Sequence, residues 1–221
     1  MSLIRPSRHL RRMLLATGLA LPLLLSACAT PQVHSSTQVR EIHLTSGDLK
    51  RGGIAFVTPS SATGQEEDKQ PLALAFTEVL KQTRPDLRIM SLSETLSAVN
   101  GAGLADAYRR MFEDYRLTGL FDRNMLQKLA RVTGMRYLAQ LKLVGFQQDS
   151  KDRWGIFGLR VIETKITVLR LFLQVWDSRD GAVVWEGSEE MTFSHDSTAE
   201  DAVTFKSAVE QSAGKLISRL P

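Results

Sequence analysis

The chain has 221 residues but only one cysteine, Cys28, so it cannot form an internal disulfide bond. It also lacks a long apolar run, because the mostly apolar segment Met13 to Leu25 is shorter than the ~20 residues that a membrane-spanning helix needs. An excess of charge is missing too: four of the 28 basic residues lie before that segment, which leaves 24 basic against 24 acidic residues after it. A near-neutral mature chain argues against a nucleic-acid-binding surface, and its stability must come from a hydrophobic core.

The first 27 residues have the layout of a secretory signal. Arg5, Arg8, Arg11 and Arg12 come first, the apolar segment follows, and the small pair Ser26-Ala27 leads to Cys28. The run Leu25-Ser26-Ala27-Cys28 resembles the lipobox of bacterial lipoproteins. That resemblance implies cleavage before Cys28, a diacylglycerol on its thiol, and a fatty acid such as palmitate on its new amine. Because Ala29 follows, instead of an aspartate resembling an inner-membrane retention signal, we expect a lipid anchor in the outer membrane with the domain facing the periplasm.

The remaining chain divides into two parts by composition. Residues 28–48 are mostly polar and predict a lipidated cysteine followed by a flexible tether, although a weak alternation from Val39 to Leu44 allows a short edge strand. Residues 49–221 predict a single periplasmic domain of ordinary size.

Apolar spacing and turn residues predict the elements of this domain. The expected strands cover residues 53–59, 87–90, 137–143, 161–176 and 182–193. The expected helices are one starting at Pro71, one capped by Ser91 and Glu94, one over 104–119, one from Asp122 to Gly134, and one opened by Ser197 and Glu200. The fold class is therefore α+β, or α/β: a small mixed β-sheet with amphipathic helices packed on it.

The turn Asp177 to Gly181 predicts a hairpin with a defined register. If Gly181 takes a left-handed bulge position, Val175 faces Val183 and Leu173 faces Trp185. That register gathers Leu169, Leu171, Leu173 and Val175 on one apolar face with Val183 and Trp185.

A search for catalytic, metal or cofactor residues gives only weak candidates. His34 and His43 lie on the expected tether, and Ser194-His195-Asp196 holds the letters of a triad at positions that rarely converge. Gly101-Ala102-Gly103 follows a helix instead of a strand, so it does not match a dinucleotide-binding loop. Glu189-Glu190 in a strand would point to opposite faces. We therefore expect no cofactor, no metal and no enzymatic activity.

Aromatic side chains are the remaining candidates for contact with a partner. Trp154 and Phe157 lie in the connection before the second long strand, while Phe172 and Trp176 share its less apolar face. Exposed, they would form a protein contact, because aromatic residues are enriched at the centres of interfaces. The simpler alternative is that a second layer of helices covers them.

Three segments carry a further resemblance. They are Gly53 to Val57, Ala130 to Leu138 entering a strand, and the hairpin Leu171 to Asp177 with Val183 to Glu186. Together they resemble the curli-secretion lipoprotein domain, the lipoprotein activators of penicillin-binding proteins, and the amino-terminal domain of the Tol-system periplasmic protein. The resemblance implies a non-catalytic scaffold, activator or pore subunit.

The leading hypothesis is a lipid-anchored binding or assembly module of the cell envelope that acts through a protein partner, with a homo-oligomer as an open option. One alternative is a secretion-channel subunit, but Arg160, Glu163 and Lys165 interrupt the long strand that it would need. Another is an envelope hydrolase, for which His195 is the residue to test.

Overall fold

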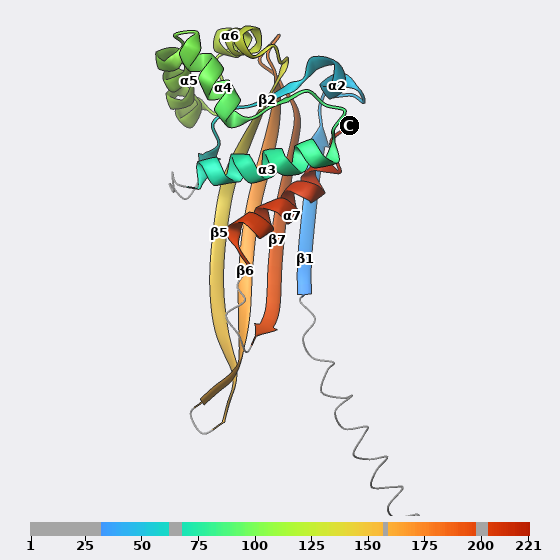
Figure 1. Ribbon diagram of the computed structural model, residues 1–221, viewed down its shortest axis with the longest axis vertical. Helices are drawn as coiled ribbons and strands as arrows, with labels where there is room; N and C mark the ends of the chain where they lie inside the picture. Colours follow the sequence, from blue (N-terminus) through green and yellow to red (C-terminus); the bar gives the residue numbers. More distant parts are fainter. Residues whose placement is uncertain (1–31, 62–67, 157–158, 198–202) are drawn as a thin grey trace, which may run out of the picture.

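The computed structural model describes residues 32–61, 68–156, 159–197 and 203–221, and for 150–156, 159–164 and 195–197 it describes the backbone alone. One seven-stranded mixed sheet runs through the domain in the order β1-β7-β6-β5-β2-β4, with β3 paired to β5 (Figure 1). Its strands are β1 (Gln32–Glu41), β2 (Ile54–Phe56), β3 (Ser60–Ser61), β4 (Ile89–Met90), β5 (Tyr137–Ile156), β6 (Leu159–Asp177) and β7 (Val183–Ser197). The described helices are α2 (Asp48–Gly52), α3 (Lys69–Thr83), α4 (Leu92–Gly101), α5 (Ala105–Thr118), α6 (Arg123–Thr133) and α7 (Phe205–Ile217). The predicted class, a mixed sheet with helices packed on it, is confirmed.

Each face of the sheet carries its own apolar core. Leu169, Leu171, Leu173 and Val175 alternate along β6 and pack, with Trp185, against the buried sides of α3 and α7. The opposite face presents Leu138 and Trp176 to the buried sides of α4, α5 and α6. Figure 1 shows α3 and α7 crossing the long strands, with α4, α5 and α6 gathered at one end. Strand alternation thus divides neighbouring residues such as Val175 and Trp176 between two cores.

Local signals located several helix ends correctly. Ser91 and Glu94 form the predicted capping box, with the Ser91 backbone N–H donating to Glu94 at 2.6 Å. Asp122 accepts a hydrogen bond from the Met125 backbone N–H at 2.8 Å and opens α6, and Gly134 ends it in the left-handed region. Two starts differ. α3 begins at Lys69, two residues before Pro71, and α7 begins at Phe205 behind the cap Thr204, because Ser197 belongs to β7 and Glu200 lies outside the described residues.

The predicted hairpin register is wrong by two residues, although it assigns the faces of β6 correctly. Val175 pairs with Trp185 and Leu173 with Gly187, and a bulge between Val175 and Trp176 leaves Val184 as the extra residue. The Val184 carbonyl accepts backbone N–H bonds from residues 42, 43 and 44 at 3.0–3.1 Å, so the chain leaving β1 fixes the bulge. A glycine is required opposite Leu173, because a Cβ on Gly187 would lie 2.5 Å from the Trp185 ring.

The segment expected to be a tether contains an edge strand. β1 pairs with β7 along its whole length, from Gln32 opposite Ser194 to Glu41 opposite Trp185. Nine of its ten residues are exposed, so apolar burial contributes little to its docking. Glu189 supplies a specific link instead: Ser35 and Thr37 each donate a hydroxyl hydrogen bond of 2.5 Å to its carboxyl group, which is 1% exposed. Residues 32–41, whose polar composition predicted a tether, form a solvent-exposed edge strand.

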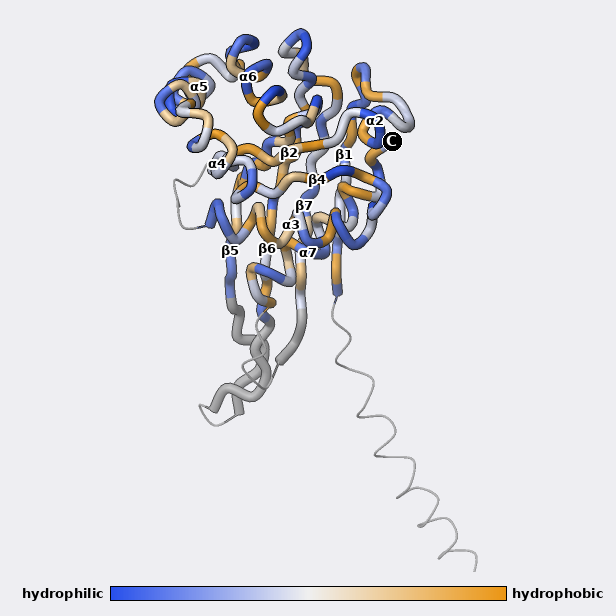
Figure 2. The backbone as a smooth tube through the Cα atoms, turned by 45° about the horizontal axis from the view of Figure 1, so that its top comes forward, coloured by the Kyte–Doolittle hydropathy of each residue, from blue (hydrophilic) through white to orange (hydrophobic). Residues whose placement is uncertain are grey.

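β5 and β6 also continue further than predicted, to Ile156 and from Leu159. Their pairing extends to these residues, interrupted by irregularities after Leu143 and near Trp154. β5 becomes hydrophilic below the helices (Figure 2), which explains why apolar alternation predicted only its first part.

Replacing Glu189 by alanine should lower the free energy of unfolding by about 1–3 kcal/mol, because the hydroxyl groups of Ser35 and Thr37 lose their acceptor. Urea unfolding of the domain measures this change. The matched control is Glu190→Ala: the neighbouring side chain points to the other face and forms an exposed pair with Arg170 at 2.7 Å, so its loss should cost at most about 0.5 kcal/mol. Equal effects of the two substitutions would contradict the role of Glu189.

Candidate functional site

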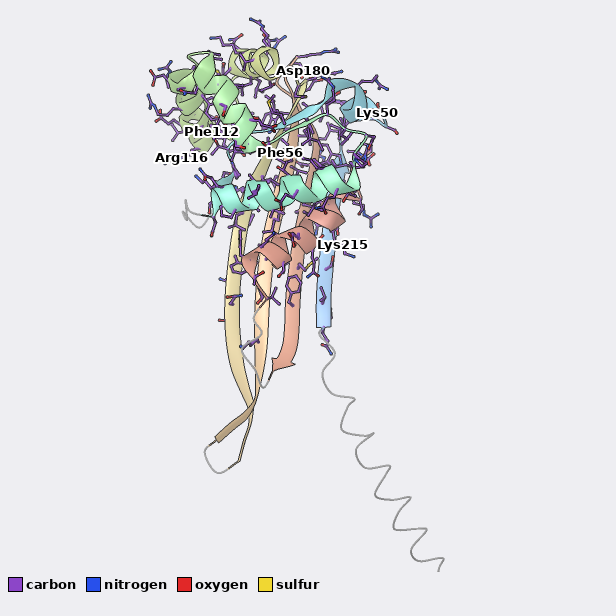
Figure 3. All side chains as sticks on the ribbon, viewed as in Figure 1. Lys50, Phe56, Phe112, Arg116, Asp180 and Lys215 are labelled. Carbon is purple, nitrogen blue, oxygen red and sulfur yellow. The ribbon has the colours of Figure 1, made fainter. Side chains whose placement is uncertain are left out.

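An arginine-lined cleft of about 490 Å³ lies at the end of the sheet where β5 begins and β6 ends. Its lining residues are Arg51, Gly52, Ala130, Arg131, Gly134, Met135, Arg136, Ser178 and Arg179. Four of these carry guanidinium groups and none carries a carboxylate. Lys50 and Asp180, neighbours of two lining residues, mark this end of the molecule in Figure 3. The cleft is therefore a local concentration of positive charge, although residues 28–221 as a whole hold 24 basic and 24 acidic residues.

Arg136 is the fixed centre of this cleft. Its Nε donates to both carboxylate oxygens of Asp177, at 3.0 and 3.1 Å, and its Nη2 donates to one of them. The guanidinium also lies 4.9 Å from the centre of the Tyr137 ring. Its backbone joins two elements, since its N–H donates to the Gly52 carbonyl and its carbonyl accepts from the Ser178 N–H. A bidentate ion pair of this kind fixes the orientation of the guanidinium group as well as the position of its charge.

The ion pair shifts the proton affinity of both partners. Burial would raise the pKa of Asp177, but hydrogen bonds from Arg136 and from the Arg179 backbone N–H, with the charges of both arginines, hold it below its ordinary value. Hydrogen bonding to Asp177 raises the pKa of Arg136. Both groups therefore stay charged at neutral pH, and the negative charge of Asp177 holds the Arg136 guanidinium group in place.

Arg51 is anchored on the other side by Asp48, at 2.6 Å. The backbone N–H and hydroxyl of Thr45, together with Arg51, lower the pKa of Asp48 to about 2. The Arg51 side chain is nevertheless 69% exposed, so it can reach a ligand in the cleft while it stays near Asp48.

Arg131 and Arg179 complete the rim, and neither side chain has an ion pair among the described residues. Arg131 lies in the last turn of α6, where a cation also offsets the negative end of the helix. The turn that carries Arg179 is fixed, because its carbonyl accepts hydrogen bonds from Arg123 and Gln127 at 3.1 and 3.0 Å. Two guanidinium groups without a close ion pair among the described residues thus lie around one hollow, and Arg179 is also within the electrostatic influence of Asp177.

This arrangement suits recognition of an anion more than catalysis. Guanidinium groups match carboxylate and phosphate oxygens in pairs, and here two of the four are not neutralised. Within the described ranges, no group of three or more His, Cys, Asp or Glu side chains could hold a metal ion. None of the helices described is both long and apolar enough to cross a bilayer.

The residues singled out in the sequence are scattered. Cys28 and Phe157 lie outside the described residues, and of Trp154 only the backbone, in β5, is described. Phe172 is half-buried. Trp176 is 2% exposed, with ring centres of Phe121 and Tyr115 at 5.0 and 6.4 Å, so the helix layer covers it and it cannot serve as a surface contact. His34 and His43 are exposed, and the side chain of His195 is not described.

Sequence reasoning missed the arginines of the cleft. Arg51, Arg136 and Arg179 lie more than 40 residues apart in the sequence. The parallel pairing of β2 with β5, together with the hydrogen bond from the Arg136 N–H to the Gly52 carbonyl, brings α2 beside the start of β5. The one signal available was local: Arg136 directly precedes β5, and Arg179 lies in the turn that follows β6, the strand paired with β5.

No protein-family model matches the chain, and no curated protein sequence matches it. Among solved structures, it is similar to a PelC dodecamer from Paraburkholderia phytofirmans, with 12% identity, 85% of this chain and 97% of that chain covered, and a TM-score of 0.49. It is also similar to lipoprotein GNA1162 from Neisseria meningitidis (12% identity, 76% and 93% covered, TM-score 0.43) and to the LpoB C-terminal domain from Salmonella enterica (14% identity, 63% and 82% covered, TM-score 0.33). One of the three is named a lipoprotein. With each TM-score below 0.5, these likenesses carry no conclusion about activity or partners.

Replacing Asp177 by asparagine should destabilise the domain by about 1–3 kcal/mol at pH 7, because Arg136 loses its charged partner. The folded pKa of Asp177 is lowered from the ordinary 3.8, so its contribution is complete above that pH and is lost as the pH falls through the folded value. The difference between wild type and Asp177→Asn should therefore shrink below about pH 4, in urea unfolding measured from pH 7 to pH 3. Asp114→Asn, on the exposed side of α5, is the control and should change stability by less than about 0.5 kcal/mol. A difference independent of pH would contradict the ion-pair assignment.

Proposed function

We propose that the chain is a lipid-anchored, non-catalytic module of the bacterial cell envelope, attached to the outer membrane through Cys28. Its domain faces the periplasm and binds an acidic surface of an envelope protein through the arginine-lined cleft. The lipobox supports the anchor, and the geometry of the cleft supports the chemistry of the partner.

The observation that carries this proposal is the direction of β1. Cys28 lies four residues before Gln32, where β1 begins, and β1 then runs to Glu41, opposite Trp185 and close to the β6–β7 turn. Ten residues of strand span roughly 30 Å. The cleft includes that turn, so it lies at the end of the sheet far from the anchor. A module attached at one end would present the cleft to the periplasm.

The cleft fits a protein surface with clustered carboxylates. Arginine is enriched at interface centres, where its planar group pairs with carboxylates and stacks on rings. Trp154, Phe157 and Phe172 remain proposed contact residues outside the cleft. A homo-oligomer also remains a proposal.

The structure gives the secretion-channel alternative a strand of sufficient length, but this strand does not have the composition that a channel needs. Past Gly145 the β5 strand continues to Ile156, long enough to cross a bilayer. Its next residues, Gln147, Gln148 and Asp149, are polar at consecutive positions, so neither face has the apolar alternation of a lipid-facing strand. We therefore do not favour the channel.

Replacing Cys28 by alanine should move the protein from the outer-membrane fraction to the soluble periplasmic fraction and abolish labelling by an alkyne fatty acid, because no thiol remains to receive lipid. Ala29→Ser is the control, since it alters the neighbouring residue and keeps the thiol. Unchanged membrane attachment and labelling in Cys28→Ala would overturn the anchor.

A photo-reactive amino acid at Asp180, beside the cleft, should form one discrete adduct with an envelope protein in living cells, whereas the same probe at Arg116 on α5 should not (Figure 3). Reversing two charges, with Arg131→Glu and Arg179→Glu, should reduce the adduct at least about tenfold, because carboxylates then face carboxylates. Mass spectrometry of the adducts is the measurement. An adduct that survives charge reversal, or that forms equally from Arg116, would count against the cleft as the contact.

A further inference from the structure

The sheet is uneven at the end where the anchor joins it. Gln32 pairs with Ser194, Ser194 with Ile166, and Ile166 with Asp149, so these four residues form one row across β1, β7, β6 and β5. At that row β1 reaches Gln32, the first of the described residues. β5 and β6 continue to the pair Ile156 and Leu159 and form a projecting hairpin, visible at the lower end of Figure 1.

The length of this projection can be compared with the reach of the anchor. From Asp149, in that row, to Ile156 the strand advances roughly 23 Å, at about 3.3 Å per residue. From Gln32 back to Cys28 the chain spans at most about 14 Å, even when fully extended. With the sheet upright on the membrane, the hairpin end would therefore lie about 9 Å deeper than the lipidated residue, which is comparable to the headgroup layer on one side of a bilayer.

The composition of the hairpin changes at the same level. Residues 147–153, which form the stem, are all polar or charged. Towards the end, the residues with described backbone are Trp154, Gly155, Ile156, Leu159, Arg160, Val161 and Ile162. Tryptophan is enriched at the membrane–water interface, and arginine bonds anionic headgroups while its stem lies along apolar surface. A polar stem with an apolar, arginine-flanked end is suited to a lipid surface.

We propose that the end of the β5–β6 hairpin, residues 154–156 and 159–162, enters the headgroup region of the membrane that holds the anchor. This inference rests on the proposed lipidation of Cys28, because the comparison of lengths requires that residue to lie at the bilayer surface. The hairpin supplies a second attachment point, which holds the sheet upright and keeps the arginine-lined cleft at the greatest distance from the lipid.

Tryptophan fluorescence tests the proposal on the full mature lipoprotein, reconstituted into vesicles of phosphatidylethanolamine and phosphatidylglycerol. The chain has three tryptophans, and Trp176 and Trp185 are buried in the two cores, so lipid should not reach them. Brominated lipids should therefore quench a component of the emission that is absent from Trp154→Phe. Acylation of Cys28 is confirmed beforehand by intact mass.

The outcomes separate the two proposals. Absence of acyl mass would refute the proposed anchor, whereas acylated protein with no Trp154-dependent quenching would refute the hairpin contact alone. Leu159→Asp should reduce the quenching several-fold, because a carboxylate resists transfer into the interface. Val144→Asp is the matched control. Val144 is an exposed apolar residue of β5 that precedes the polar stem, so this substitution should leave the quenching unchanged. A Trp154 probe that is not quenched in vesicles but crosslinks to a protein in cells would assign the hairpin end to a protein partner instead and overturn the proposal.

Discussion

The antiparallel pairing of β1 with β7 is the constraint on which the functional argument depends. If β1 were a free tether, the anchor could attach the domain in any orientation, and no end of the sheet would be distinguished. Because β1 is paired over ten residues, the chain arrives from one end of the sheet and leaves at the other. Ser35 and Thr37 on Glu189 add a specific side-chain link to a ladder with little apolar burial. The pairing, reinforced by these polar contacts, thus decides which end of the sheet would face a membrane if Cys28 carries the proposed anchor.

The ends of the sheet differ because its strands differ in length. At one end, parallel β2 and β5 start together, and Arg136 is tied to both Gly52 and the β6–β7 turn through backbone hydrogen bonds. Many elements meet there, so side chains are held in fixed positions. At the other end the β5–β6 hairpin extends furthest among the described residues, without a helix over it in Figure 1. The end where many elements meet is suited to selective recognition of charge. The end with the projecting hairpin is suited to contact with a surface that has no fixed shape.

Sequence reasoning succeeded where the determinants are local. The capping box of Ser91 and Glu94 and the left-handed Gly134 depend on residues within one helical turn, so spacing alone identified them. It failed where the determinants are distant. The alternation from Val39 to Leu44 indicated only a short edge strand, and the polar residues 32–38 before it belong to β1 because they pair with β7. The bulge at Val184 depends on amide groups of residues 42–44, about 140 residues earlier in the chain, and no local pattern of Val183 and Val184 indicates it. The sequence assigned Trp176 to the correct face of its strand and left open whether helices cover it. The answer depends on where α5 and the following loop pack, since Tyr115 and Phe121 lie against the Trp176 ring.

The charge balance limits how the cleft can act. Residues 28–221, which would remain after the expected signal is removed, hold 24 basic and 24 acidic residues and so have almost no net charge to attract a partner over long distances. At physiological ionic strength the field of four arginines is screened within about 8 Å, so the cleft distinguishes partners only after contact. For a protein free in solution, this would slow association, because electrostatic steering raises association rates. The lipid anchor proposed at Cys28 would remove much of that disadvantage, since the partner and the cleft would then share a thin layer next to the membrane. A neutral body with one basic cleft is therefore better matched to an anchored module than to a freely diffusing one.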